Sequence, residues 1–146
     1  MLYEIERNGY LYSSDKSKLD INFIHQFLTN CYWAKGRTLE QVQQTIANSL
    51  CYGVYTQNKQ IGFARVVTDY TICASLWDVF IDEAYRGQRI GETLMDVVLN
   101  SPLTKVIDRW LLSTRDAHAL YRKFGFEQNA SLMRRSSHVP FDKIIR

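Results

Sequence analysis

The sequence predicts a fold of the α/β class, called α+β under another convention, with one mixed sheet and helices on both of its faces. Runs rich in β-branched and aromatic residues alternate with runs whose apolar residues recur at helical spacing. Three β-rich runs in the middle follow one another directly, as in an antiparallel meander, and a helix and a strand come next, as in a crossover. The predicted element order is βααβββαβαβ. With 146 residues, of which 46% are apolar, the chain can bury one core, so we expect a single domain over residues 1–146.

The first third of the chain predicts one strand and two helices. Residues 2–12, rich in tyrosine and isoleucine, form the strand. Asp20 can cap the first helix, whose apolar stripe consists of Ile21, Ile24, Phe27, Leu28 and Cys31. Thr38 and Gln41 have the spacing of a capping box and begin a second helix that ends near Leu50. Its apolar stripe consists of Leu39, Val42 and Ile46.

The middle of the chain predicts the meander and a third helix. Residues 51–56 and 61–68 read as a hairpin joined by the polar residues 57–60, and residues 76–81 add a third strand. A loop with two glycines follows. One face of the third helix then carries Ile90, Leu94, Val97 and Val98.

The last third predicts two strands around a short helix. Residues 107–113 are apolar enough for a central strand. Asp116 can cap a helix over residues 117–124, which Gly125 ends in the left-handed conformation. We expect the final strand to include residues 132–134.

The net charge of +3 comes from the C-terminal segment alone. Four cations there outnumber one acid, whereas residues 1–133 are neutral. A nucleic-acid binder would concentrate its basic residues on one face or stripe, so a solvated basic tail is favoured and no nucleic-acid partner is expected. The residues of this segment are Arg134, Arg135, Asp142, Lys143 and Arg146.

Three cysteines, Cys31, Cys51 and Cys73, lie in apolar neighbourhoods without CxxC spacing. This pattern favours reduced, buried thiols over disulfides or zinc ligands. Neither His25 nor His138 has partners at metal-ligand spacing, so no metal is expected. The N-terminus has no apolar signal region and no run approaches the ~18 residues needed to span a bilayer, which predicts a cytoplasmic protein without a membrane partner.

The loop Arg86-Gly87-Gln88-Arg89-Ile90-Gly91 lies between a predicted buried strand and a predicted helix. Such a loop turns free backbone N–H groups toward one point, where the helix dipole also favours an anion, and the two glycines let a ligand approach the backbone. A glycine turn without a ligand is the alternative. The loop lacks the Gly-Lys-Ser/Thr ending of a Walker A motif, and no ribose-binding acid follows in a Rossmann arrangement, so nucleotide hydrolysis and NAD binding are not expected.

Together with a second motif, this loop resembles the GNAT superfamily of N-acetyltransferases. The cofactor motif of that family runs Arg/Gln-x-x-Gly-x-Gly/Ala; Arg86 and Gly91 match its ends, while Arg89 replaces its middle glycine. The second motif is Leu120-Tyr121-Arg122-Lys123-Phe124-Gly125-Phe126, which is similar to the family's Leu-Tyr helix followed by Gly-Phe. The resemblance covers residues 75–127 strongly and the rest of the chain weakly.

The resemblance implies acetyl-CoA as co-substrate and assigns its binding residues. The backbone of Val79, Phe80 and Ile81 would pair with the pantetheine arm, and the amides from Gln88 to Gly91 would hold the pyrophosphate. Tyr121 would face the thioester sulfur. The full set of cofactor-binding candidates is Val79, Phe80, Ile81, Arg86, Gly87, Gln88, Arg89, Ile90, Gly91, Glu92 and Tyr121.

Acetyl transfer to an amine needs a neutral amine and a proton source for the departing thiolate. Tyr121 is the candidate acid, with core packing as its alternative role. Asp78 is the candidate base, although strand alternation sends it away from Ser75 and Trp77 unless a bulge intervenes. A role as a hydrogen-bonded strand acid, with deprotonation through water, stays open. His118, one turn before Tyr121, is a weaker candidate.

Tyr32, Trp33 and Trp77 are the candidate acceptor-binding residues, an aromatic wall suited to a flat or cationic amine, and Arg37 lies at the same junction. The predicted function is therefore acetyl transfer from acetyl-CoA to a primary amine of a small molecule, by a monomer or homodimer. Two alternatives stay open: a non-catalytic module that binds acyl-CoA, and an acetyltransferase of protein or peptide amines.

Overall fold

Six strands form one sheet in which the spatial order follows the chain order. The computed structural model describes residues 1–135, so His138, Asp142, Lys143 and Arg146 lie outside the described residues. The first five strands pair antiparallel, and the sixth is parallel to the fifth. The strands are β1 (Glu4–Arg7), β2 (Tyr10–Ser13), β3 (Leu50–Thr56), β4 (Lys59–Thr68), β5 (Cys73–Ile81) and β6 (Arg109–Leu112).

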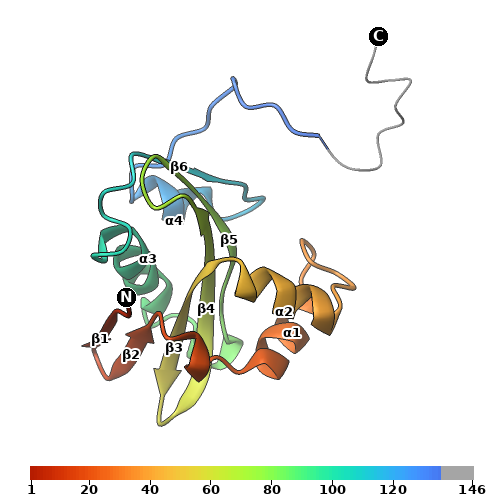
Figure 1. The fold of residues 1–146 in the computed structure, drawn as a ribbon, viewed down its shortest axis with the longest axis vertical. Helices are drawn as coiled ribbons and strands as arrows, with labels where there is room; N and C mark the ends of the chain where they lie inside the picture. Colours follow the sequence, from red (N-terminus) through yellow and green to blue (C-terminus); the bar gives the residue numbers. More distant parts are fainter. Residues whose placement is uncertain (136–146) are drawn as a thin grey trace.

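Within residues 1–135, four α-helices cover the two faces of this sheet. Helices α1 (Ile21–Thr29) and α2 (Leu39–Ala47) lie on one side, and α3 (Ile90–Asn100) and α4 (His118–Arg122) lie on the other (Figure 1). Each side has its own apolar cluster, one centred on α3 and one on α1 and α2. The predicted mixed sheet with helices on both faces is confirmed. No helix within residues 1–135 has the length and apolar character needed to cross a bilayer.

Local capping signals position both early helices as predicted. The Asp20 carboxylate accepts a 3.0 Å hydrogen bond from the backbone N–H of Phe23. Thr38 and Gln41 form the reciprocal capping box, with bonds of 3.1 and 2.9 Å. The second helix ends at Ala47, before the predicted Leu50, because Leu50 is already the first residue of β3.

The N-terminal strand prediction was wrong in one respect. Residues 2–12 contain two short strands, not one, because the chain reverses at Asn8 and Gly9. Both residues have positive φ, 52° and 85°, as a two-residue hairpin turn requires. The predicted 57–60 connection is also shorter, since β4 begins at Lys59.

Two predictions near the C-terminal end were also wrong. Residues 132–134 form no strand, and the side chains of Leu132 and Met133 are exposed, so they gain no apolar burial from a neighbouring strand. Asp116 does not cap α4: no side chain caps the helix at its N-cap residue, and the N–H of Ala117 instead donates to Thr114 Oγ1 at 3.0 Å. Gly125 follows the helix with φ +87°, as predicted.

A β-bulge in β5 decides which face Asp78 occupies. The β4–β5 register passes from Phe63↔Phe80 to Arg65↔Trp77, so two residues of β5 lie opposite one residue of β4. Asp78 itself has φ +56°. Because of the extra residue, Asp78 and Trp77 both lie on the α1–α2 side of the sheet, where both contact Arg65.

All three cysteines are free, as expected, but only one of them is buried. Burial raises the pKa of the Cys51 thiol to about 11. Cys31 is half-buried and Cys73 is exposed at the start of β5, which corrects the prediction that all three are buried.

Candidate active site

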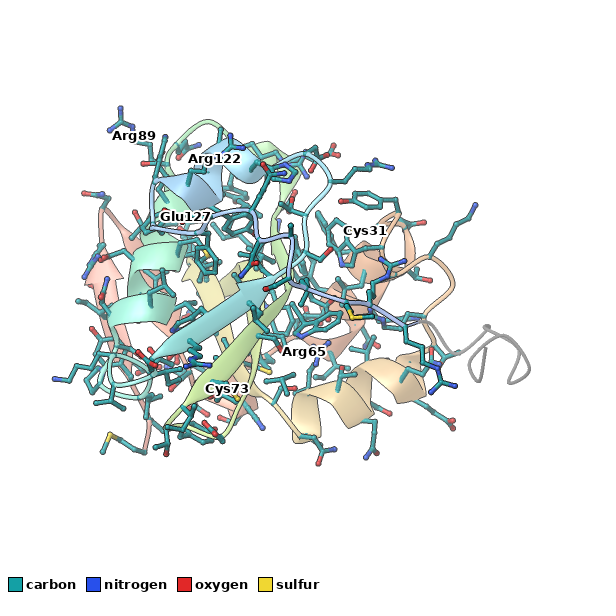
Figure 2. All side chains as sticks on the ribbon, turned by 90° about the horizontal axis from the view of Figure 1, so that it is seen from above. Cys31, Arg65, Cys73, Arg89, Arg122 and Glu127 are labelled. Carbon is teal, nitrogen blue, oxygen red and sulfur yellow. The ribbon has the colours of Figure 1, made fainter. Side chains whose placement is uncertain are left out.

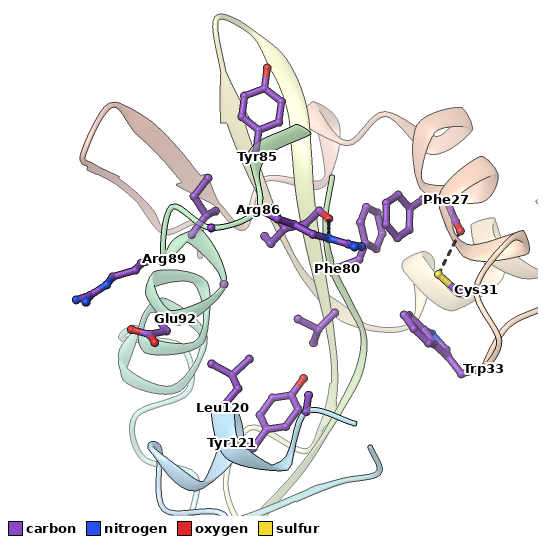
Figure 3. Close-up of a pocket in the computed structure, with 16 residues that line it drawn as sticks. Phe27, Cys31, Trp33, Phe80, Tyr85, Arg86, Arg89, Glu92, Leu120 and Tyr121 are labelled. Carbon is purple, nitrogen blue, oxygen red and sulfur yellow. Dashed lines mark hydrogen bonds between the residues drawn. The ribbon is translucent and has the colours of Figure 1, made fainter. Parts of the chain in front are cut away.

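A cleft of about 420 Å³ opens beside the end of β5. Within the described residues, β6 pairs with β5 only from Cys73 to Leu76, so the rest of β5 has no partner strand on that side. Figure 3 shows the cleft between α3, α4 and the connection from α1 to α2. Its lining residues are Phe27, Cys31, Trp33, Val79, Phe80, Ile81, Tyr85, Arg86, Gly87, Arg89, Ile90, Gly91, Glu92, Ala117, Leu120 and Tyr121.

The N-terminus of α3 opens into this cleft without a cap. Its N-cap residue, Arg89, makes no side-chain capping bond and has the left-handed backbone, φ 60° and ψ 19°. In residues 1–135, the backbone N–H groups from Gly87 to Glu92 have no acceptor. Free amides at a helix N-terminus, together with the helix dipole, form a site for an anion such as a pyrophosphate.

Gly91 leaves room for a ligand against these amides. A Cβ at this position would meet only Ile81 Cγ1, at 4.0 Å, so packing within the protein does not require glycine here. Nor does backbone conformation require it, because Gly91 lies in α3 and its φ is not positive. The space beside Gly91 is therefore part of the open cleft, which this residue lines.

The charged and polar side chains of the loop point in different directions. Arg86 lies over the cleft, where its Nε donates to Ile81 O at 3.3 Å, whereas Arg89 points away from it (Figure 3). Gln88 does not line the cleft with its side chain, which accepts a 2.6 Å bond from the Tyr10 hydroxyl. Glu92 forms an exposed ion pair with Lys123 at 2.6 Å. The backbone, more than the side chains, therefore presents hydrogen-bond donors at this end of the cleft.

Tyr121 lies at the opposite end of the cleft from Tyr85. Its ring packs edge-on against Phe126, with 5.9 Å between ring centroids, and its hydroxyl points into the cleft (Figure 3). Burial raises the pKa of Tyr121 above its ordinary value, and the coulombic effect of Tyr32 acts in the same direction. The phenol therefore keeps its proton throughout the neutral range and can donate it.

The Asp78 carboxylate is fully buried and has three hydrogen-bond donors around it. Oδ2 accepts from Arg37 Nη1 at 2.7 Å and from Arg65 Nε at 2.9 Å, while Oδ1 accepts from Trp33 Nε1 at 3.1 Å. Asp78 does not line the cleft. This geometry supports the role of a hydrogen-bonded strand acid.

The three predicted acceptor residues are divided between two cavities. Trp33 lines the cleft and also a second cavity, which Trp77 lines from the other side. Tyr32 lines neither and packs edge-on against Trp33, beneath the guanidinium of Arg115. His118 starts α4 but does not line the cleft.

Sequence reasoning missed several residues of this region. Phe27, which stacks on Phe80 with 3.9 Å between centroids, and Tyr85 both line the cleft. Arg65 is the most informative omission, because a lone arginine in the apolar run 61–68 and a lone aspartate in the apolar run 76–81 suggest a buried ion pair between adjacent strands. Figure 2 shows Arg65 and Cys31 away from Arg89, which extends from the outer edge of the molecule.

Known proteins share the sequence pattern and the fold of this chain. A sequence profile described as the acetyltransferase (GNAT) domain matches residues 47–128. A crystal structure of an acetyltransferase assigned to the GNAT family, from Xanthomonas campestris pv. campestris, is 39% identical and superimposes with a TM-score of 0.85, over 90% of this chain and 95% of that one. A predicted acetyltransferase from Clostridium acetobutylicum, whose structure was determined with acetyl-CoA, shares the fold with a TM-score of 0.60 at 14% identity, over 93% of this chain and 96% of that one.

Among curated proteins, an uncharacterized ycf52-like N-acetyltransferase of Prochlorococcus marinus is 36% identical over 99 residues. The match covers 64% of this chain and 54% of that relative, so the chain spans about half of its length.

Proposed function

Since this chain belongs to the GNAT acetyltransferase family, we propose that it transfers the acetyl group of acetyl-CoA to a primary amine of a small molecule. The observation that carries the proposal is the uncapped N-terminus of α3, whose free amides face one end of a cleft that has the Tyr121 hydroxyl at its other end. An anion site and a protonated acid at the two ends of one cleft suit a phosphate-bearing thioester.

The residues present fit acetyl-CoA. The amides of Gly87 to Glu92 would hold the pyrophosphate, and Arg86, whose Nε donates to Ile81 O over the cleft, would add positive charge. The unpaired edge of β5 at Val79, Phe80 and Ile81 would receive the pantetheine arm by adding backbone hydrogen bonds. When bound, acetyl-CoA supplies the acetyl group as a thioester, and the reaction forms an amide and releases a thiol.

Tyr121 acts as the general acid in this proposal. A tyrosine hydroxyl is protonated at neutral pH, and burial raises the pKa of Tyr121 further, so the hydroxyl carries the proton that the departing sulfur needs. The same shift has a consequence for stability. Because the pKa is higher in the folded protein, the associated stabilisation is complete below the unfolded pKa of about 10 and is lost as the pH rises through the folded value.

We propose that water, and not a side chain, removes the proton from the attacking amine. The candidate base Asp78 already accepts bonds from two guanidinium groups and an indole and has no exposed side-chain surface. We assign it a positioning role, in which it holds Arg37, Arg65 and Trp33 beside the acceptor end of the cleft.

The Tyr121→Phe variant tests the proposal. Phenylalanine preserves the packing against Phe126 and removes only the hydroxyl, so kcat on an accepted amine should fall about 10²- to 10⁴-fold. The affinity for CoA, measured by isothermal titration, should stay within a factor of two or so of the parent value. Tyr70→Phe, on the exposed turn between β4 and β5, is the matched control and should change neither quantity.

The outcomes separate the proposal from its alternatives. An unchanged kcat in Tyr121→Phe would remove this residue from the mechanism. CoA binding without turnover on any amine would instead identify a non-catalytic acyl-CoA module. Acetylation confined to peptide lysines or N-termini would replace the small-molecule acceptor, and the absence of any CoA-induced rise in Tm would overturn the cofactor assignment.

A further inference from the structure

A second cavity, of about 500 Å³, lies on the α1–α2 side of the sheet and adjoins the cleft at Trp33. Its walls come from the connection between α1 and α2, from α2 itself, and from β4 and β5. If the chain is the acetyltransferase proposed above, this cavity lies next to the acetyl end of the cleft. The residues that line it can then select the acceptor.

The charged residues in this cavity are all cationic. Among residues 1–135, Lys35, Arg37 and Arg65 line it, and no acidic side chain does. The carboxylate of Asp78, which pairs with both arginines, has no exposed surface and neutralises only one of these three charges. The remaining positive charge attracts an anion and repels a second ammonium group, which disfavours the cationic amine that the aromatic wall of Tyr32, Trp33 and Trp77 suggested.

The two guanidinium groups are already held in position. Arg65 donates from Nε to Asp78 and from Nη1 to Ser49 Oγ at 3.1 Å, and its guanidinium lies 5.7 Å from the centroid of the Trp77 ring. Arg37 donates from Nη1 to Asp78, and its backbone carbonyl accepts from His25 Nε2 at 3.0 Å. Because the two arginine side chains would lose little further entropy when an anion binds, most of the interaction energy would contribute to its affinity.

Hydrogen-bond donors remain available in the same cavity. A guanidinium has five N–H groups, and among residues 1–135 Arg37 uses only Nη1 in side-chain bonds. The ammonium of Lys35 makes no hydrogen bond or ion pair within this part of the chain, and the residue is exposed beside the cavity. Such unused donors match the oxygen atoms of a carboxylate or phosphate.

We propose that the acceptor is an amine that also carries an anionic group, carboxylate or phosphate, bound by Lys35 and Arg37. Its amine reaches the cleft beside Trp33, and the indoles of Trp33 and Trp77 flank the body of the molecule. Both rings are about half exposed, 42% and 47%, and are therefore free to contact it. This inference names the acceptor class and rests on the proposed acetyl transfer.

Matched pairs of amines test the inference. Phenylalanine is compared with phenethylamine for the carboxylate, and phosphoethanolamine with ethanolamine for the phosphate, as kcat/KM per unprotonated amine at one ionic strength. In at least one pair the anionic member should be favoured about tenfold or more, as expected for a charge-assisted bond. The favoured pair identifies which anion the cavity takes.

The Lys35→Gln variant should reduce that preference several-fold, because it removes one cation that faces the cavity. Lys105→Gln, an exposed lysine on the connection from α3 to β6, is the matched control and should leave the preference unchanged. Equal or better use of the uncharged amines by the parent enzyme would overturn the inference and leave acetyl transfer intact.

A binding measurement covers the case in which no amine is acetylated. N-acetylphenylalanine and inorganic phosphate are titrated into the parent protein and Lys35→Gln, each with saturating CoA, and followed by the change in Tm. A shift that Lys35→Gln weakens would support an anion site even though the proposed reaction had failed. The absence of a shift with both probes would overturn it.

Discussion

The two cavities that meet at Trp33 are built in opposite ways. The cleft presents backbone: free amides at the start of α3, the unpaired edge of β5 and a glycine whose missing side chain leaves space. The second cavity presents side chains: two arginines held by one buried carboxylate, a lysine and two indoles. Backbone groups in the first can hold the same ligand whatever side chains surround them. In the second, a single substitution can change which ligand is bound.

This difference predicts opposite responses to mutation. Loss of a side chain should matter in the second cavity and matter little in the loop from Arg86 to Gly91. Addition of a side chain should matter in that loop and matter little in the second cavity. Three substitutions test the comparison, and they are ordered here by the size of the expected effect.

Asp78→Asn should have the largest effect, because it leaves Arg37 and Arg65 without their counter-charge. Removing one member of a buried ion pair costs about 3 kcal/mol or more, and the low end applies because Arg37 is 18% exposed and can turn to solvent. Asparagine tolerates the positive φ of this position, so the change isolates charge from backbone. Urea denaturation measures the loss.

The affinity of Asp78→Asn for CoA should remain within a few-fold of the parent value, since Asp78 does not line the cleft. A variant with normal stability but a kcat that collapses, together with a lost limb of the pH–rate profile, would identify Asp78 as the general base. That result would also contradict the comparison, because a side chain of the second cavity would then take part in the reaction in the cleft.

The two cavities also differ in how much of each the sequence reveals. The loop from Arg86 to Gly91 is contiguous, so its glycines and the following helix can be recognised without the fold. The same holds for the caps at Asp20 and at Thr38, where each partner is three residues away. The Asn8-Gly9 turn is an equally local signal, and the prediction of a single N-terminal strand overlooked it.

The second cavity depends on contacts that span many residues. Arg37, Arg65 and Asp78 come from three elements, and Asp78 faces the two arginines only because of the bulge in β5. The sequence is compatible with that bulge but does not determine it, because a bulge depends on how two strands pair and not on either strand alone. Arg65 could have been found only by asking what neutralises a charge in an apolar strand.

Gly91→Ala should affect the cofactor and leave the fold intact. The new methyl group meets no protein atom closer than 4.0 Å, and alanine favours the helix by about 0.5–1 kcal/mol, so the ligand-free Tm should stay level or rise. The methyl occupies space beside the free amides, but the family motif accepts alanine at this position, so the affinity for CoA should fall by a few-fold at most, whereas a larger side chain at position 91 should lower it further. Calorimetry and thermal unfolding on the same sample measure both quantities. If the affinity for CoA and the ligand-free Tm both fall, Gly91 is needed for packing within the protein.

Arg89→Gly should have the smallest effect and the opposite sign. Arg89 adopts φ 60°, a conformation that costs an ordinary residue about 1 kcal/mol and glycine almost nothing, and its side chain points away from the cleft. Glycine also makes the unfolded chain more flexible, which offsets part of the gain, so we expect stability between the parent value and about 1 kcal/mol above it.

Arg89→Ala is the matched control: it removes the same charge but keeps the backbone cost, so it should be less stable than the glycine variant. Both variants should bind CoA within a few-fold of the parent protein, because the amides that form the anion site are unchanged. An equal, large loss of affinity in both would show that the guanidinium itself holds the phosphates, and that this loop, like the second cavity, depends on its side chains.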